Sequence, residues 1–419
     1  MISSNQDQTF NQDRTSFIPS PRSANHYHSY NYGELPQGCQ YCVRGEKLVY
    51  FVTGLCPRKC SFCPVSDEKF GQDITFANER KVFSEQELLL EANVMTAKGA
   101  GITGGDPLAR LPRTIAFIRL MKQQYGKQFH IHLYTSLNLV TEQALQQLYD
   151  AGLDEIRFHL DLESEQFWSR LLLAKKFPWK IGVELPVIPG QEPEQKKVIN
   201  YIHGNIDFLV LNELEVADNR QSTLLQQGFT TKDQWSYAVK GSLEAGQELL
   251  DYIQRQGYSF SAHLCTARLK DKVQLGNRLR REAQGARKKF DQVDEEGLLT
   301  RGALYLPELV PGFGYRKKLE ACNKLEASNK FNKPELLERL RSLLSMIKED
   351  CRLTNEEIFL DREKPRILLS AKKIKPLQKK FRRWGLIPAI VKEYPTADQL
   401  EIEVELFGGD GVGGRRSWN

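Results

Sequence analysis

The chain reads Cys56-Pro57-Arg58-Lys59-Cys60-Ser61-Phe62-Cys63 directly after a short apolar run, so its spacing is C-x3-C-x2-C. Three thiolates this close together can hold three corners of a cubic iron–sulfur cluster. The motif supplies no ligand for the fourth iron, and an open iron can bind and cleave a small molecule. The stretch therefore predicts a 4Fe-4S cluster with one free coordination site, ligated by Cys56, Cys60 and Cys63.

Short apolar runs alternate with helical patterns from residue 47 to about residue 265. Helices are expected at 84–97, 114–125, 141–151 and 234–256, the first of them with Ser84 as N-cap and Glu87 in the capping-box position. Strands are expected near 48–53, 100–103, 130–134, 155–160, 181–188, 208–211 and 259–264. The alternation predicts βαβ units on a parallel sheet, hence the α/β class and a partial parallel (β/α)6-type barrel over residues 34–265. Because such barrels carry their chemistry at the carboxyl ends of the strands, the cysteine loop lies where an active site is expected.

The remaining segments differ from the barrel in composition. Residues 1–33 are rich in Ser, Asn and Gln and predict a disordered tail. Residues 266–295 are strongly basic and predict a linker helix. Residues 296–407 follow a β-α-β-β-α-β pattern, which is typical of a smaller, ferredoxin-like α+β domain. Residues 408–419 are rich in glycine and predict a flexible tail.

The composition narrows the class of protein. The 419 residues carry a net charge of +6, and no apolar run approaches the roughly 20 residues that cross a bilayer. No secretory signal is visible at the start of the sequence. Five of the eight cysteines fall between residues 39 and 63, which favours a metal site in a reducing compartment over a disulfide framework. We therefore expect a cytoplasmic protein with no membrane partner.

A second motif follows about 40 residues after the cysteines. It reads Thr103-Gly104-Gly105-Asp106-Pro107-Leu108 and ends the second expected strand. Glycines allow another group to approach the backbone closely. Taken alone such a run is usually a turn, but here it stands at the strand end next to the cysteine loop.

Together the two motifs resemble those of the radical S-adenosylmethionine (SAM) superfamily. The resemblance implies a radical SAM barrel whose 4Fe-4S cluster is chelated at its open iron by the amino and carboxylate groups of SAM. It also implies oxidoreductase chemistry: reduction by a ferredoxin- or flavodoxin-type donor gives a 5′-deoxyadenosyl radical, which abstracts hydrogen from a substrate. Phe62 occupies the aromatic position of the cysteine motif, and Gly104, Gly105 and Asp106 match the Gly-Gly-Glu-Pro motif that receives the SAM amino group. Asp106 stands where Glu is usual, so its reach is one methylene shorter.

Further candidates lie at the later strand ends. Ser136 and Asn138 match positions where the family commonly places ribose contacts, although polar residues are also ordinary there. Arg157, His159 and Asp161 alternate along one strand and share a face, where they either line the cavity or form a structural ion-pair network. The weaker candidates are Glu184, Glu213, Glu215 and the apolar strand end Val187-Ile188-Pro189-Gly190.

A second cysteine group begins with Cys39 and Cys42. This C-x2-C pair supplies half of a tetrahedral metal site, and Cys265, at the end of the seventh expected strand, is a candidate third ligand. The sequence favours a second metal, either zinc or an auxiliary Fe-S cluster, over a redox pair or unligated thiols. Cys322 and Cys351 are expected to be packing residues.

Residues 38–280 resemble an archaeal-type subgroup that is related to pyruvate formate-lyase activating enzyme. The substrate stays open, with RNA, a protein and a small molecule as options. A basic run from Lys372 to Arg383 has no acidic residue within it and would suit docking of RNA, or simply form a solvated helix face. The competing hypothesis is a zinc-ribbon nucleic-acid-binding protein built from the five clustered cysteines.

Overall fold

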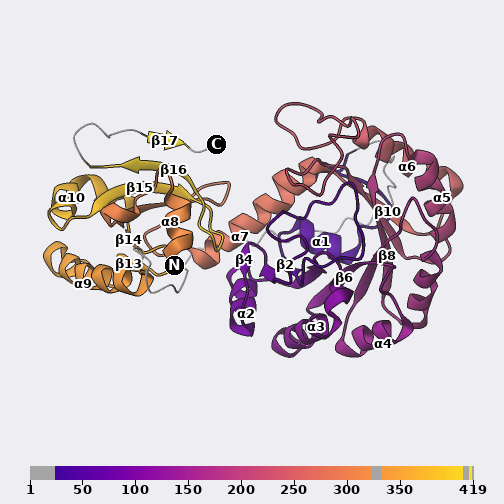
Figure 1. Cartoon of the computed structure of the whole chain (residues 1–419), viewed down its shortest axis with the longest axis horizontal. Helices are drawn as coiled ribbons and strands as arrows, with labels where there is room; N and C mark the ends of the chain where they lie inside the picture. The colour runs from indigo at the N-terminus through magenta and orange to yellow at the C-terminus, as the bar shows by residue number, and fades with distance from the viewer. Residues whose placement is uncertain (1–23, 323–331, 409–414, 418–419) are drawn as a thin grey trace, which may run out of the picture.

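Two sheets organise the molecule (Figure 1). The computed structural model describes residues 24–322 and 332–408, and the backbone of residues 415–417. The expected tail over residues 1–23 and most of the glycine-rich tail lie outside the described residues. Each sheet has a buried apolar cluster of its own. Among the described residues, no helix is both long and apolar enough to cross a membrane.

The larger sheet has a run of parallel strands at its centre. Its strand order is β1-β10-β9-β8-β7-β6-β5-β2-β3-β4, and within the described residues the pairings from β10 to β2 are all parallel. The parallel strands are β2 (Lys47–Phe51), β5 (Gly99–Thr103), β6 (His130–Ser136), β7 (Glu155–His159), β8 (Lys180–Val187), β9 (Phe208–Glu213) and β10 (Ser261–Cys265). The order ends in two different strands, so the sheet is an open partial barrel. It confirms the α/β class, and β10 corresponds to the seventh strand, which was expected near residues 259–264.

Helices cover the outer face of this sheet. Figure 1 shows them in a row around it: α2 (Glu85–Val94), α3 (Leu111–Tyr125), α4 (Glu142–Ala151), α5 (Glu192–Ile202) and α6 (Ser242–Gln256). The capping box of Ser84 and Glu87 is confirmed at the start of α2. The helix expected from residue 234 begins only at Ser242, because Gly241 adopts a φ of +86° that interrupts the helical backbone. Short 3-10 helices, η1 (Pro107–Arg110) and η2 (Trp168–Lys176), lie between strands.

The edges of the sheet are antiparallel. The hairpin of β3 (Phe76–Ala77) and β4 (Arg80–Lys81) extends the β2 edge, and β1 (Tyr30–Tyr32) pairs with β10 at the other edge. The disorder expected up to residue 33 is therefore wrong for these residues. Their polar composition hid a strand whose Asn31 Oδ1 accepts a 2.6 Å hydrogen bond from the buried His263 ring.

The segment expected to be one basic linker helix contains three elements. A π-helical stretch, η3 (Leu269–Leu275), runs into α7 (Gly276–Ala286), and the short strand β11 (Gln292–Val293) follows. Its cations are largely paired within the protein. Arg278 binds Glu79 at 2.6 Å, and Arg281 donates to the backbone carbonyls of Met95 and Thr96. The segment is thus docked on α2 and the β3–β4 hairpin, and its basic composition does not create a free cationic surface.

A buried carboxyl group on α7 gives this docking a pH dependence. Burial raises the pKa of Glu282 from its ordinary 4.5 to about 8, against the Arg278 charge and with support from Glu79 and Glu91. Between these two pH values the folded chain holds a proton that the unfolded chain has lost. The free energy of unfolding should therefore fall as pH rises, by at most about 1.4 kcal/mol per pH unit.

Glu282→Gln should accordingly stabilise the chain at pH 8 and have little effect at pH 4.5. Denaturant titrations of the metal-free chain at both pH values would measure this. Glu349→Gln, at an exposed position of the helix α9 (Lys333–Cys351), is the matched control and should have little effect on stability at either pH value. An equal effect of Glu282→Gln at both pH values would contradict the prediction.

The smaller sheet is antiparallel. It has the order β13-β14-β12-β15-β16-β17, with β11 beside β12. Its strands are β12 (Leu299–Tyr305), β13 (Ile358–Asp361), β14 (Arg366–Leu369), β15 (Ile387–Glu393), β16 (Glu401–Leu406) and β17 (Arg415–Ser417), and its helices are α8 (Tyr315–Cys322), α9 (Lys333–Cys351) and α10 (Ala371–Arg383). Numbered by appearance from β12 to β15, the strands lie in the order 2-3-1-4. Together with the helices between them, this is the ferredoxin-like arrangement, extended at one edge by β16 and β17.

Candidate active site

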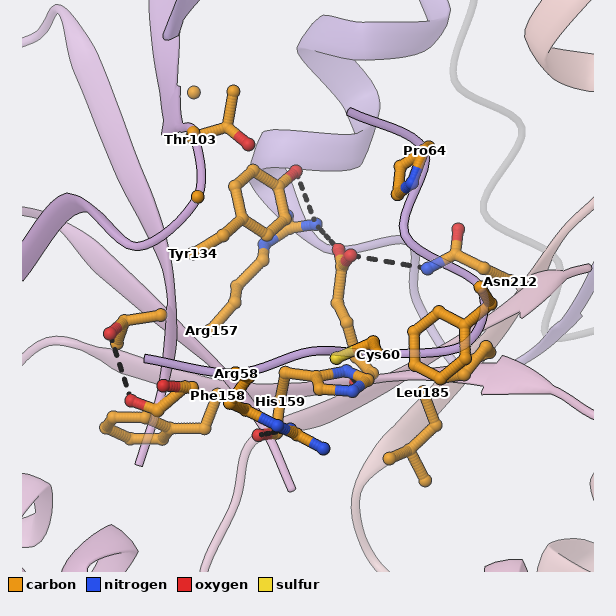
Figure 2. Close-up of a pocket in the computed structure, with 18 of the residues that line it drawn as sticks. Arg58, Cys60, Pro64, Thr103, Tyr134, Arg157, Phe158, His159, Leu185 and Asn212 are labelled. Carbon is orange, nitrogen blue, oxygen red and sulfur yellow. Dashed lines mark hydrogen bonds and ion pairs between the residues drawn. The ribbon is translucent and has the colours of Figure 1, made fainter. Parts of the chain in front are cut away.

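A cavity of about 490 Å³ lies at the carboxyl ends of the parallel strands. Each strand from β2 to β9 in the parallel run contributes to its wall, and Figure 2 shows the side chains that converge on it. The strand ends Thr103, Ser136, His159 and Glu213 all line it. An adjoining hollow of about 430 Å³ shares the wall formed by the cysteine loop. The position agrees with the expectation for a β/α barrel.

The three cysteines of the first motif lie around these hollows. Cys56 and Cys60 line both, and Cys63 lines the second. Burial raises the pKa of the Cys56 thiol to about 11 and also raises the pKa of Cys60 and Cys63. Without a metal these thiols would stay protonated at neutral pH. A metal ion or cluster is the partner that would convert them to thiolates.

The two glycines fix the second motif against the base of the cysteine loop. Gly105 N donates to Thr53 O at 2.7 Å, and Asp106 N donates to Leu55 O at 2.8 Å. A Cβ atom at Gly105 would lie 2.3 Å from Leu55 O, and one at Gly104, whose φ is +151°, would lie 2.5 Å from Thr53 O. Neither position has room for a side chain, so both residues must be glycine for the two loops to meet.

Asp106 does not line the cavity. Its side chain is fully buried and accepts four hydrogen bonds: from Leu108 N, Thr135 Oγ1, Ser136 N and Ser136 Oγ, at 2.6–3.1 Å. The carboxylate therefore ties the end of β5 to the end of β6. In this geometry Asp106 holds Ser136 at the cavity wall and does not itself line the cavity, so a direct contact of Asp106 with SAM stays a prediction.

Of the other residues expected to contact the cofactor, two line the cavity and one does not. Ser136 lines the cavity, but Asn138 does not, because it lies beyond the strand end, where its carbonyl accepts a hydrogen bond from Arg170. Phe62 lines the cavity and packs against an apolar cluster that contains Ile188. The apolar strand end after β8 thus meets the aromatic residue of the cysteine motif.

A polar network forms the wall on β7, β8 and β9. Arg157 Nη1 lies 3.4 Å from Tyr134 Oη and 2.6 Å from Glu184 Oε1, and Asn212 donates to Glu184 Oε2 at 3.3 Å (Figure 2). His159 lies with its ring 5.6 Å from that of Phe62. Burial, with the Arg58 charge, lowers the pKa of His159 to about 4, so its imidazole is neutral at physiological pH.

The remaining weak candidates have paired roles. Asp161 lies outside the cavity wall and binds Arg58 of the cysteine loop at 3.2 Å. Glu213 and Glu215 line the cavity, where Glu213 accepts from Ala267 N and Glu215 binds Lys270. Of the three residues expected to share a face, Arg157 and His159 line the cavity, whereas Asp161 forms an ion pair outside its wall.

Sequence reasoning missed the segment between β9 and α6. Asn219 Nδ2 donates to both Cys63 O and Val65 O at 2.9 Å, and Thr223 N donates to Ser61 O at 2.7 Å. Backbone N–H groups of Gln221 and Ser222 bond Asn219 Oδ1, which forms a turn typical of Asn. The turn could have been predicted from the sequence. Its contact with a loop about 155 residues earlier could not.

The second cysteine group is brought into one region. Cys39 and Cys42 lie on α1 (Gln37–Val43), and Cys39 and Cys265 belong to the same buried cluster. Burial raises the pKa of Cys39 to about 11 and that of Cys265 to about 12. Among the described residues, these three thiols do not form a group whose ligand atoms all lie within 4.8 Å. A second metal there stays a prediction.

The zinc-ribbon hypothesis is wrong. A zinc ribbon would require the five clustered cysteines to form one small module. Here α1 and the cysteine loop lie on either side of β2, which is a strand of the larger parallel sheet. The first pair packs beside β10, whereas the C-x3-C-x2-C loop faces the cavity.

Comparisons with known proteins agree with this site. Residues 50–170 match the model of the radical SAM superfamily. A Methanocaldococcus jannaschii protein, provisionally named as a glycyl-radical enzyme activating enzyme, is 37% identical over 283 residues, which cover 65% of this chain and 74% of that protein. Biotin synthase of Marinobacter nauticus is 26% identical over 141 residues, covering 32% and 37% of the two chains. The crystal structure of methylornithine synthase superposes with a TM-score of 0.35 at 12% identity, over 56% of this chain and 79% of that one.

The matched region contains both motifs and the cavity wall from β5 to β7. With its C-x3-C-x2-C loop, its Gly-Gly-Asp-Pro turn and a relative aligned over most of its length, this chain belongs to the radical SAM superfamily of enzymes.

Proposed function

We propose that the chain reductively cleaves SAM at a 4Fe-4S cluster held by Cys56, Cys60 and Cys63, and that the resulting radical abstracts hydrogen from a substrate. The observation that carries the proposal is the arrangement of three thiols around two adjoining hollows that Gly104 and Gly105 also line, with the end of β6 in the wall of the first. When bound there, a reduced cluster supplies the electron that breaks the sulfonium C–S bond of SAM and yields a 5′-deoxyadenosyl radical.

The residues present suit such a cluster. The donor set is three soft sulfur atoms, and soft thiolates select Fe–S clusters over hard cations. The Arg58 side chain is anchored by Asp161 and by the carbonyl of His159, which fixes the cysteine loop against β7. Asn219 and Thr223 hold the same loop from the other side.

SAM would lie along the edge formed by β5 and β6. Its amino group would meet the backbone of Gly104 and Gly105, where no side chain intervenes, and its ribose would meet Ser136. Phe62, which lines the cavity and packs against the cluster that contains Ile188, would offer an apolar surface to the adenine. The substrate would then bind beside the charged part of the cavity wall that Arg157 and Glu184 form. An electron donor of the ferredoxin or flavodoxin type and a cytoplasmic location follow as parts of the proposal.

Anaerobic incubation of the reconstituted chain with SAM and dithionite tests the proposal. 5′-Deoxyadenosine should form, and no product should form when the reductant is omitted. A chain that carries the cluster and gives no deoxyadenosine, with or without candidate substrates, would overturn the proposal.

For the substrate we favour a protein. The M. jannaschii relative is named for activation of a glycyl-radical enzyme, a protein partner. In addition, the segment that clamps the cysteine loop exposes three large apolar side chains: Leu225 (62% exposed), Trp235 (87%) and Tyr237 (66%). Exposed aromatic residues are enriched at protein interfaces. The base of this segment adjoins the cavity, since Glu215 in the cavity wall pairs with Ala238.

Trp235→Ala should therefore weaken the action on a protein substrate and spare SAM cleavage without substrate. We expect the KM for the protein partner to rise by about tenfold or more, because truncation of an interface Trp commonly costs about 2 kcal/mol. Phe83→Ala is the matched control, since Phe83 is 79% exposed but lies before α2. Equal effects of the two substitutions would contradict a docking role for Trp235.

RNA as the substrate has weaker support. The basic run on α10 is partly neutralised: Lys373 binds Glu357, Lys375 binds Glu405 and Lys380 binds Asp350. Docking of RNA on this unit would have to break or bypass these pairs.

A further inference from the structure

Three ligating side chains lie together at the end of the barrel opposite the active-site cavity. His130 is the first residue of β6, His132 lies two residues further on the same face, and Glu155 begins β7 in register with His132. All three are buried, with exposures of 4%, 0% and 1%. They form a group whose ligand atoms all lie within 4.8 Å of one another.

Two glycines leave room for the His132 imidazole. On β5, a Cβ atom at Gly101 would lie 2.7 Å from His132 Nε2, and from α1 a Cβ atom at Gly38 would lie 2.7 Å from His132 Nδ1. The helix α1 also packs against β5 and β6 at this end of the barrel.

The polar atoms of the group are incompletely satisfied. His130 Nδ1 and His132 Nδ1 have no hydrogen-bond partner within the described residues. Glu155 Oε2 lies 3.5 Å from His130 Nε2 and 3.4 Å from Gly38 N. Ordinary N–H···O bonds measure about 2.7–3.2 Å. Two ligand atoms each about 2.1 Å from one ion at the tetrahedral angle lie about 3.4 Å apart, which matches the His130–Glu155 separation.

The local charges balance. Arg157 binds Glu155 Oε1 at 2.5 Å and Glu184 at 2.6 Å. The charge of Lys47 also acts on the His132 ring, so two carboxylates face two cations, and the donor atoms rather than a net charge would hold the ion. Arg157 would then act as the outer hydrogen-bond donor that holds the ligating carboxylate of Glu155 in place.

We propose that His130, His132 and Glu155 bind a divalent first-row transition-metal ion at the closed end of the barrel, separate from the iron–sulfur site. Two imidazoles and one carboxylate are a nitrogen and oxygen donor set of the kind that suits zinc or ferrous iron. The ion would join β6 to β7 and fix Glu155. Through Arg157 it would also fix Glu184 in the wall of the cavity.

Zinc is the probe for the test, because the iron of the cluster does not contribute at the zinc X-ray absorption edge. The full-length chain, expressed with added zinc and carrying its cluster, should contain about one zinc per chain, bound by nitrogen and oxygen only. His130→Gln and His132→Gln should each lower the zinc content to less than about a fifth of an atom per chain. His263→Gln is the matched control, a buried histidine on the inner face of β10 outside the group, and should keep the zinc.

The absorption spectrum of the unaltered chain decides the question even if the histidine variants fail to fold. Absence of zinc, or a zinc coordination shell that contains sulfur, would overturn the proposal. Sulfur in the shell would indicate that Cys39, Cys42 and Cys265 bind the zinc instead. Because SAM cleavage is not the readout, this failure is distinguishable from a failure of the proposed function.

Discussion

Cys60→Ala should reduce the iron of the reconstituted chain from about four atoms to a small fraction of one. Two thiols remain, Cys56 and Cys63, and they cannot hold a cubane that already lacks a fourth protein ligand. We expect 5′-deoxyadenosine formation to fall by more than about a thousandfold, equivalent to about 4 kcal/mol of lost barrier reduction. Iron and sulfide analysis together with anaerobic product assays would measure both effects.

The matched control for this substitution is Cys351→Ala. Cys351 ends α9 in the unit of the smaller sheet, far along the chain from the cysteine loop, and is expected to pack rather than ligate. It should leave iron content and product unchanged. If Cys60→Ala protein kept its cluster and its SAM cleavage, the assignment of the three ligands would be wrong.

Asp106→Asn should lower the free energy of unfolding by about 3 kcal/mol, although the shape of the side chain and its number of heavy atoms stay the same. The carboxylate accepts four hydrogen bonds, whereas an amide has one acceptor oxygen and would turn an N–H₂ group toward donors. The thermal midpoint should fall by roughly 6–12 °C. Because Ser136 Oγ loses its 2.6 Å bond to Asp106, we also expect weaker binding of SAM.

Thermal unfolding and the SAM dependence of product formation would measure the two effects. Asp150→Asn is the control, because Asp150 is exposed at the end of α4 and should tolerate the same change within about 0.5 kcal/mol. An Asp106→Asn chain as stable as the control, with raised KM for SAM alone, would favour a direct contact of Asp106 with SAM.

The sequence predicted what depends on local pattern. The alternation of apolar runs and helices predicted the parallel sheet, and the C-x3-C-x2-C spacing predicted the position of Cys56, Cys60 and Cys63 at the cavity. The β-α-β-β-α-β pattern predicted the strand order of the smaller sheet. In each case the signal lies within about ten to thirty residues of chain.

What the sequence did not reveal depends on contacts between distant segments. Asp106 was expected to face the cofactor, but its direction is set by Thr135 and Ser136, 29 and 30 residues later. The strand β1 was hidden in a polar segment because its partner β10 lies more than 200 residues away. The same holds for the group of His130, His132 and Glu155, since strand register decides that these residues meet.

The open iron is the central claim, and electron paramagnetic resonance of the reduced cluster tests it most directly. Addition of SAM to the dithionite-reduced, full-length chain should change the g-values of the cluster signal, because SAM would become a ligand of the iron that the cysteine motif leaves free. A cubane signal that is identical with and without saturating SAM would contradict the account, as would a reconstituted chain with no cubane signal.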